Sequence, residues 1–420
     1  MRGGFGIGYN RTEDAIPLNA LMNPSPIFAS FGIIAGSNIV YAAPSDPHQF
    51  APYPANPNAK LTFDPTTNIP TSGAPITLNA LPRNLLSPYT YRYSLLTQYD
   101  LGHSMVATVG YQGTSSHRLL RWNFNGQILF EPQNPQVNNL RFWTDDVDGN
   151  YNALLTELQK RFSHGFQLDA RYTFSRAMDD ASTNFYFDAF PFNAKAGYGP
   201  SDYDAKHNFK LWGLWTPQIF KDRQSWEEKV LGGWTFSGIW NVHSGFPWTP
   251  LYNVQVVGDP NTCSLIFENS GYCSVRPAAY LGGAGTDYSN STFKKQLGNF
   301  PNGPTAYFTP PTLTTTSIPP VPGVARNSFR GPRYSSVDFT LAKAFGLPSA
   351  KVIGENAKLE IRANFYNLFN QVNLGPLGNQ TIGNIALTTT GQTVSGNTTF
   401  DQAQFALAGR VIEAQARFSF

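Results

Sequence analysis

The last twelve residues, Gly409 to Phe420, alternate without error between two side-chain classes. One class is Ile412, Ala414, Ala416, Phe418 and Phe420, and the other is Glu413, Gln415, Arg417 and Ser419. Successive side chains of a β-strand point to opposite faces, so the pattern predicts a strand with one apolar and one charged face. A transmembrane β-barrel strand needs such faces, because one meets lipid and the other water. A soluble edge strand is the alternative, although such a strand seldom ends on the final aromatic residue of a chain.

Other segments repeat this design. Phe166 to Ser175 and Lys358 to Phe365 alternate strictly, and Tyr151 to Phe162 joins the first of them through a tight turn, Ser163-His164-Gly165. Further expected strands are Arg2 to Tyr9, part of Ile27 to Tyr41, Tyr89 to Tyr99, His103 to Tyr111, His207 to Trp215, Trp234 to His243 and Ser335 to Phe345. Their polar faces carry ions, which a wet lumen accommodates and a soluble core does not.

Composition excludes two other classes of protein. Charged residues make up 14% of the chain, against roughly 25% in soluble domains, while aromatic residues also reach 14%. The mean hydropathy of -0.29 and the lack of any long apolar run exclude a helical membrane protein. The net charge of +3 is too small to indicate nucleic-acid binding.

The connections between the expected strands alternate between short and long. Short links are expected at 100–102, 163–165 and 346–356, a moderate link at 216–233, and long outer loops at approximately 42–88, 112–150, 177–206, 244–334 and 371–403. Outer-membrane barrels have short periplasmic turns and long extracellular loops. We therefore expect one transmembrane domain over residues 1–420, with a periplasmic C-terminus and extracellular loops.

The expected number of strands does not fit a closed single-chain barrel. About eleven strands emerge, whereas single-chain bacterial barrels have an even number. A barrel in lipid must close, because an open edge leaves backbone groups unpaired. The predicted fold is all-β, an antiparallel outer-membrane β-barrel of which this chain is the C-terminal part. A missed strand in Ser244 to Tyr334 would instead permit a small closed barrel.

Several segments together resemble the C-terminal barrel region of Oar-like TonB-dependent receptors. They are RGGFGIGY (2–9), SPYTYRYSL (87–95), YNALLTELQKRFSHGFQLDARYTFSRAMDD (151–180), GPSDYDAKHNF (199–209), GGWTFSGIWNVHSGFPWTP (232–250), RNSFRGPRYSSVDFTLAKAF (326–345) and LEIRANFYNLFNQVNLG (359–375). The resemblance implies binding and uptake of a large nutrient, such as a glycan, peptide or metal chelate, across the outer membrane.

The resemblance also implies partners. They are outer-membrane lipids, the barrel-assembly machinery, and TonB acting only through a plug domain for which this sequence has no counterpart. A terminal strand that ends in Phe is similar to the signal read by the assembly machinery, so Phe418 and Phe420 are the expected assembly signal.

Two groups of residues are candidates for a disulfide or a metal site. Cys263 and Cys273 lie ten apart without His or further Cys at metal-ligand spacing, which favours an exposed disulfide over zinc, with free thiols as the alternative. Acidic residues gather around one expected outer loop, at Asp179, Asp180, Asp188, Asp202 and Asp204. Their spacing matches no calcium-loop pattern, so turn-forming and lumen-facing roles are favoured over Ca²⁺. His207 is expected to be polar lining. No metal or cofactor is expected.

Enzyme signals are weak. Ser115, Ser116 and His117 are neighbours, as are Ser163 and His164, but none sits in a nucleophile elbow and all fall in expected loops or turns. The stretch GGFGIG near the N-terminus lacks the strand and helix of a dinucleotide site. We therefore expect no enzyme.

Aromatic residues have two expected roles. Trp212, Trp215, Trp234, Trp240, Trp248, Phe418 and Phe420 are assigned mainly to girdles at the membrane interfaces. Aromatic residues of one long outer loop are the ligand-contact candidates: Phe185, Tyr186, Phe187, Phe190 and Phe192. The sequence thus favours an outer-membrane receptor or transporter barrel. The alternative is a secreted soluble all-β protein that binds ligands or acts on carbohydrates.

Overall fold

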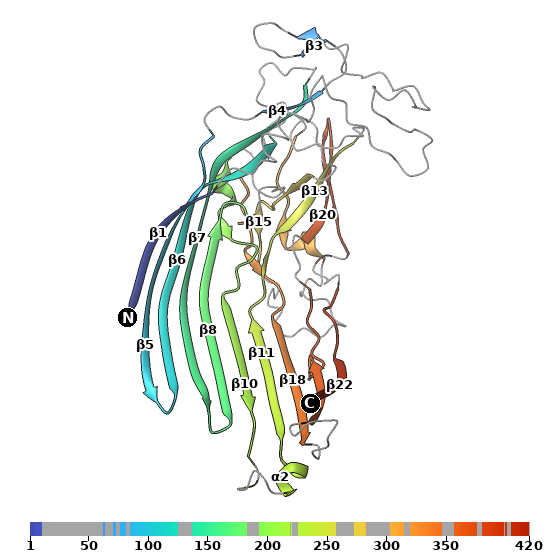
Figure 1. Ribbon diagram of the computed structural model, residues 1–420. Coiled ribbons are helices and arrows are strands. Elements are labelled where there is room, and N and C mark those ends of the chain that lie inside the picture. Colours follow the sequence, from blue (N-terminus) through green and yellow to red (C-terminus); the bar gives the residue numbers. More distant parts are fainter. Residues whose placement is uncertain are drawn as a thin grey trace, which may run out of the picture.

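The alternating strands pair in chain order into one curved antiparallel sheet (Figure 1). The computed structural model describes residues 1–10, 62–63, 70–72, 76–80, 85–124, 137–182, 193–218, 220, 226–257, 273–282, 303–314, 320–346, 357–375, 380–398, 400 and 405–419. Ten strands follow one another across the sheet in the order β1-β5-β6-β7-β8-β10-β11-β18-β19-β22, while β4 and β9 add to β7 and β8. This arrangement confirms the predicted antiparallel all-β fold.

The main-sheet strands are β1 (Arg2–Tyr9), β4 (Ile76–Ala80), β5 (Tyr89–Gly102), β6 (Met105–Phe124), β7 (Val137–Ser163), β8 (Phe166–Asp179), β9 (Gly199–Pro200), β10 (His207–Trp215), β11 (Trp234–His243), β18 (Tyr334–Gly346), β19 (Lys358–Tyr366) and β22 (Val411–Ser419). The shorter strands are β2 (Thr62–Phe63), β3 (Pro70–Ser72), β12 (Pro247–Trp248), β13 (Pro250–Val256), β14 (Cys273–Val275), β15 (Ala279–Tyr280), β16 (Phe308–Thr309), β17 (Phe329–Arg330), β20 (Gln380–Thr388) and β21 (Gly391–Gly396). The helices are η3 (Ala194–Gly197), α2 (Trp226–Leu231) and η4 (Pro304–Ala306).

The pairing register keeps polar and apolar side chains on separate faces of the sheet. Arg362 lies opposite Gln415, and the neighbouring pair joins Ile361 to Ala416. The polar face carries ion pairs, as where Arg171 contacts Glu157 at 2.9 Å and Asp169 at 2.9 Å. Because a one-residue shift would exchange the faces, the register fixes one charged face and one apolar face across the sheet. We call these the polar face and the apolar face.

The apolar face is exposed along the whole sheet. Its exposed side chains include Phe5, Leu95, Val109, Tyr111, Leu154, Leu158, Phe174, Trp215, Trp240, Ile361, Ile412 and Phe418. Soluble monomers rarely expose an apolar surface of this extent. Such a face is what a strand in contact with lipid presents.

The links between neighbouring main-sheet strands are short at one end and long at the other. The turns at 103–104 and 164–165 have left-handed residues, with φ of 51° at His103 and 52° at His164. Helix α2, which lies between β10 and β11 in the chain, is at this same end (Figure 1). The predicted link at 112–150 differs, because β6 and β7 continue as paired strands through most of it. Most of that expected loop therefore consists of two paired strands, with register shifts between Ser116 and Arg121.

The predicted strand within Ile27 to Tyr41 lies outside the described residues. Within 244–334 the described strands, β12 to β17, pair outside the main sheet, so no twelfth wall strand arises from that described part of the segment. Strands β1 and β22 each have one partner among the described strands and do not pair with each other. No helix in the described ranges is long and apolar enough to cross a membrane.

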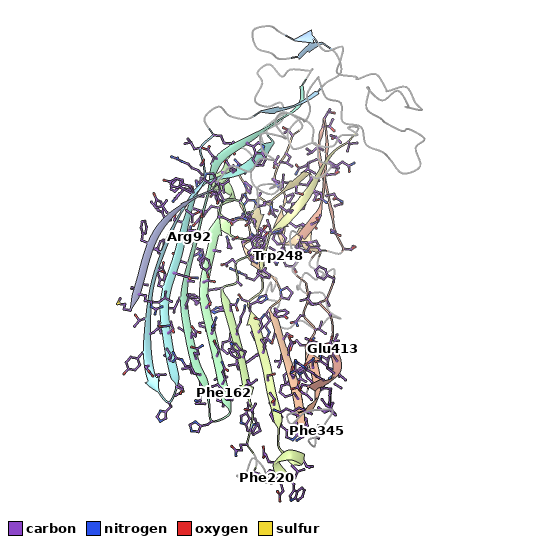
Figure 2. All side chains as sticks on the ribbon, viewed as in Figure 1. Arg92, Phe162, Phe220, Trp248, Phe345 and Glu413 are labelled. Carbon is purple, nitrogen blue, oxygen red and sulfur yellow. The ribbon has the colours of Figure 1, made fainter. Side chains whose placement is uncertain are left out.

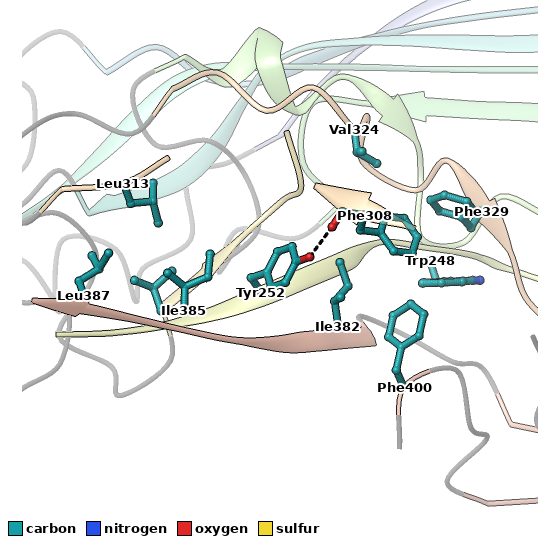
Figure 3. Close-up of a cluster of buried hydrophobic side chains, with 11 residues drawn as sticks. Trp248, Tyr252, Phe308, Leu313, Val324, Phe329, Ile382, Ile385, Leu387 and Phe400 are labelled. Atoms are coloured by element: carbon teal, nitrogen blue, oxygen red, sulfur yellow. Dashed lines mark hydrogen bonds between the residues drawn. The ribbon is translucent and has the colours of Figure 1, made fainter. Parts of the chain in front are cut away.

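The two long links after β11 and β19 fold together into a small module at the long-link end of the sheet (Figure 1). Its sheet runs β14-β13-β20-β21, and β13 and β20 are parallel although they come from different links. Its core consists of Trp248, Tyr252, Val254, Phe308, Leu313, Val324, Phe329, Ile382, Ile385, Leu387 and Phe400 (Figure 3). We call this unit the loop module. Trp248 packs there against Phe329 with ring centroids 5.1 Å apart, so it is a core residue and not a girdle residue as expected.

Candidate functional site at the long-link end

Arginine side chains fasten the loop module to the wall. Arg326, which is fully buried, donates from Nε to the carbonyl oxygen of Gly197 at 2.8 Å. Its two Nη atoms reach the carboxylates of Asp179 and Asp202. A planar guanidinium with five donors suits this many acceptors. The residue thus joins the loop module to the segment that follows β8.

Two further arginines repeat the connection. Arg330 pairs with the buried carboxylate of Asp204 and donates to the carbonyl oxygen of Gly245 at 3.4 Å. Arg276 donates to the carbonyl oxygen of Ala196 at 2.7 Å. The module is therefore attached to the wall by charged contacts at several points.

Lys195 forms a separate bridge between the β6–β7 hairpin and the segment after β8. Its Nζ lies 2.6 Å from Asp148 Oδ2 and 2.8 Å from Asp180 Oδ2. Burial opposes the charged ammonium, but hydrogen bonds to both carboxylates outweigh it and raise the pKa of Lys195. The bridge ties these two segments of the long-link end together.

The acidic residues predicted to gather around the loop after β8 form ion pairs with Arg326, Arg330 and Lys195. Asp179 and Asp202 face Arg326, Asp204 faces Arg330, and Asp180 faces Lys195. Asp188 lies outside the described residues. No group of His, Cys, Asp or Glu within the described ranges is arranged to hold a metal ion. The cluster is a set of ion-pair partners.

A polar hollow lies on the polar face where β1, β5 and β6 meet. Its volume is about 720 Å³, and its lining includes Thr90, Arg92, Ser94, Gln112 and Thr114. Across from them β1 contributes glycines, and a Cβ atom at Gly6 would meet nothing within 4 Å. Arg92 is exposed there (Figure 2). The hollow combines one positive charge with hydroxyl and amide groups, which suits a polar, anionic ligand group.

The girdle residues divide between the two faces. Trp215, Trp234 and Trp240 share the apolar face with Phe209 and Phe236, whereas Trp212 lies opposite Asp169 on the polar face. Phe162, Phe220 and Phe345 lie at the short-link end of the structure (Figure 2). His207 Nδ1 lies 2.8 Å from the hydroxyl of Tyr172, so this histidine forms part of an aromatic rim.

Other predicted site residues are only partly described. The ligand-contact candidates Phe185, Tyr186, Phe187, Phe190 and Phe192 lie outside the described residues, as does Phe420. Phe418 lies in β22. Cys273 begins β14, while Cys263 lies outside the described ranges, so their disulfide stays a prediction.

One prediction about a serine-histidine pair was wrong. Ser115 and His117 were expected in a loop, but they lie within β6, and pairing with β7 brings Asp148 beside them. Ser115 Oγ is 2.9 Å from His117 Nε2, and His117 Nδ1 is 3.1 Å from Asp148 Oδ1. The sequence gives no signal for this group of three residues, because Asp148 lies 31 positions from His117 along the chain. Ser163 and His164 lie at the turn between β7 and β8, as predicted.

A comparison with protein families agrees with this architecture. A family model described as an outer membrane beta barrel domain matches residues 1–412. Among solved structures, the outer membrane transporter YddB from Escherichia coli is 9% identical, with 82% of this chain and 34% of that chain covered and a TM-score of 0.38. The pyoverdine receptor FpvA from Pseudomonas aeruginosa is 12% identical, with coverages of 80% and 30% and a TM-score of 0.37. The chain spans about a third of the length of these structures. A comparison with curated proteins found no significant match.

Proposed function

Because this chain belongs to the outer membrane β-barrel domain family, we propose that it forms the wall of a receptor or transporter for a large nutrient in the bacterial outer membrane. The observation that carries the proposal is the register of the main sheet. It places exposed apolar side chains on one face and ion pairs such as Arg362–Glu360, at 2.8 Å, on the other. Lipid on one side and a wet lumen on the other satisfy both faces.

We further propose that the receptor is Oar-like and that TonB acts on it through a plug domain outside this chain. The polar hollow at Arg92 supplies ligand contacts on the inner wall, and the loop module frames the entrance. A glycan, peptide or metal chelate fits this hollow when it presents an anionic group. The loop aromatics Phe185, Tyr186, Phe187, Phe190 and Phe192 are proposed as further contacts, and the Cys263–Cys273 disulfide as a loop constraint.

In the proposed orientation, the short-link end faces the periplasm and the loop module faces the exterior. The C-terminal strand then ends on the periplasmic side, where the barrel-assembly machinery reads Phe418 and Phe420. Deletion of Phe420 is expected to reduce the yield of protein assembled in the outer membrane, while deletion of Met1 serves as the control. An unchanged outer-membrane yield after the Phe420 deletion would count against this signal.

Membrane fractionation tests the proposal as a whole. The full chain is expected in outer-membrane fractions that resist salt and require detergent for extraction. Its migration on a gel is expected to change on heating, as folded barrels do. Recovery of folded protein in a detergent-free soluble fraction would refute the membrane function and support a secreted all-β protein instead.

A further inference from the structure

We propose that Ser115, His117 and Asp148 form a hydrolytic triad that cleaves acyl esters of membrane lipids. Serine hydroxyl to Nε2, and Nδ1 to carboxylate, is the hydrogen-bond order by which a histidine acts as general base toward a serine nucleophile. The measured distances, 2.9 Å and 3.1 Å, lie within hydrogen-bond reach. The side chains of His117 and Asp148 are 33% and 45% exposed, so the set is open to a substrate.

The carboxylate of the triad is held in place by a second contact. Asp148 contacts His117 through Oδ1, and its Oδ2 accepts a hydrogen bond from Lys195 Nζ at 2.6 Å. In addition, the backbone amide of Asp148 donates to Asp180 Oδ2 at 2.8 Å. A carboxylate fixed by such neighbours orients the imidazole toward the serine.

The backbone beside His117 is irregular in a way that suits a reacting site. The ladder between β6 and β7 shifts register between Ser116 and Leu119, and Arg118 has a left-handed φ of 57°. Arg118 is paired in neither of the described ladders of β6. Bulges and strained residues of this kind occur beside active sites. The Arg118 guanidinium lies 5.5 Å from the centroid of the Tyr89 ring, the ring that also packs beside His117, so a cationic donor stands close to the triad.

The triad lies on the apolar face, which identifies its substrate. In β6, Ser115 and His117 continue the row of Val109 and Tyr111, and the His117 ring lies 5.2 Å from that of Tyr89. On β1, which is separated from β6 by β5, this face exposes 71% of Phe5, 50% of Ile7 and 73% of Tyr9, up to the level of Tyr89. The apolar face therefore extends along the strands as far as the triad. A membrane lipid in contact with this face would bring its acyl ester to the triad.

The reaction uses only the lipid and water. His117 Nε2 accepts the Ser115 hydroxyl proton as Oγ attacks the ester carbonyl carbon, and the resulting tetrahedral intermediate expels the lipid alcohol, which takes the proton from His117. Water, deprotonated by His117, then attacks the acyl-serine. This step breaks the ester bond to Oγ, returns the proton to Ser115 and releases a fatty acid. The products are one fatty acid and one lysolipid.

The test measures fatty-acid release by the refolded full chain from micelles of phosphatidylglycerol and, separately, of lipopolysaccharide. Release from either substrate supports the proposal and identifies the lipid. Ser115→Ala is expected to reduce release to the protein-free level and His117→Gln to reduce it by about 100-fold or more. Ser116→Ala is the matched control, because its hydroxyl pairs with Thr90 at 2.9 Å outside the triad.

Heat-dependent gel migration establishes that each variant is folded. As a second readout that needs no variant, a fluorophosphonate probe is expected to label the native chain, with the adduct located on Ser115 by mass spectrometry. Folded native protein that releases no fatty acid from either lipid would overturn the proposal, and so would undiminished release by Ser115→Ala.

Discussion

Arg326 donates a hydrogen bond to the backbone carbonyl oxygen of Asp179 at 2.7 Å and also contacts its carboxylate, although the two residues lie 147 positions apart. Burying both charges costs solvation free energy, which their attraction repays only when the geometry is good. The pair contributes to the position of the loop module, because the acceptors of the buried guanidinium lie on Asp179, Ser182, Gly197 and Asp202, outside the module. This contact joins the loop module to the long-link end of the wall.

Removal of one partner of the Arg326–Asp179 pair is expected to destabilise the protein. Arg326→Ala leaves Asp179 without its buried counter-charge and should lower the free energy of unfolding of the outer end by about 3–5 kcal/mol. Limited proteolysis is expected to cut the segment 244–334 faster, with Arg333→Ala as the control because Arg333 is exposed. Equal cleavage rates for the two variants would contradict the role given to Arg326.

The Lys195 bridge predicts a dependence of stability on pH. Hydrogen bonds to two carboxylates raise the pKa of Lys195 above 10.5 despite burial, so its contribution is complete below 10.5 and is lost as pH rises through the raised value. Burial alone would raise the pKa of Asp148. The hydrogen bonds from Lys195 and His117 outweigh burial and lower that pKa below 3.8. Its contribution is therefore complete above 3.8 and is lost as pH falls through the lowered value.

Lys195→Met should accordingly lower the thermal stability between these limits and leave it little changed at more acidic or more alkaline pH. Melting temperatures across the pH range measure this difference. Lys206→Met is the control, because Lys206 contacts Phe174 and no carboxylate among the described contacts. A Lys195→Met effect that stays constant down to strongly acid pH would rule out the bridge as its cause.

The sequence predicts the wall better than the long-link end. The predicted strands Arg2 to Tyr9 and Trp234 to His243 coincide with β1 and β11, because alternation over a few residues is a local property. The parallel pairing of β13 with β20 joins Tyr252 to Gly383. No local pattern encodes a contact between segments so far apart. For the same reason, the contact between His117 and Asp148 and the burial of Trp248 in the loop module could not be predicted from the sequence.

Tyr252 provides a test of the loop-module core. Its hydroxyl donates to the carbonyl oxygen of Phe308 at 2.6 Å, and burial raises the pKa of Tyr252 to about 12. Since ionisation would put a charge into the core, the stability that depends on neutral Tyr252 is complete below pH 10 and is lost as pH rises through 12. Absorbance of tyrosinate should show one group that titrates late, and Tyr252→Phe should remove it.

Tyr252→Phe is also expected to lower the free energy of unfolding of the loop module by about 1–3 kcal/mol, because a buried carbonyl oxygen loses its donor. Tyr203→Phe is the control, since Tyr203 is 69% exposed. The assignment fails if Tyr252→Phe leaves both the late titration and the unfolding free energy unchanged.

The close approach of backbone at Gly245 predicts a strong effect of a single added methyl group. A Cβ atom at Gly245 would lie 1.8 Å from the carbonyl oxygen of Gly331, a contact that only movement of the backbone relieves. Because this approach lies where Arg330 also binds the Gly245 carbonyl oxygen, Gly245→Ala should separate the module from the wall. The expected loss is about 3 kcal/mol in the free energy of unfolding. Gly6→Ala is the matched control, since its Cβ meets nothing within 4 Å. Urea unfolding of both refolded variants measures the difference, and equal stabilities would show that the outer end tolerates a shift of the backbone at Gly245.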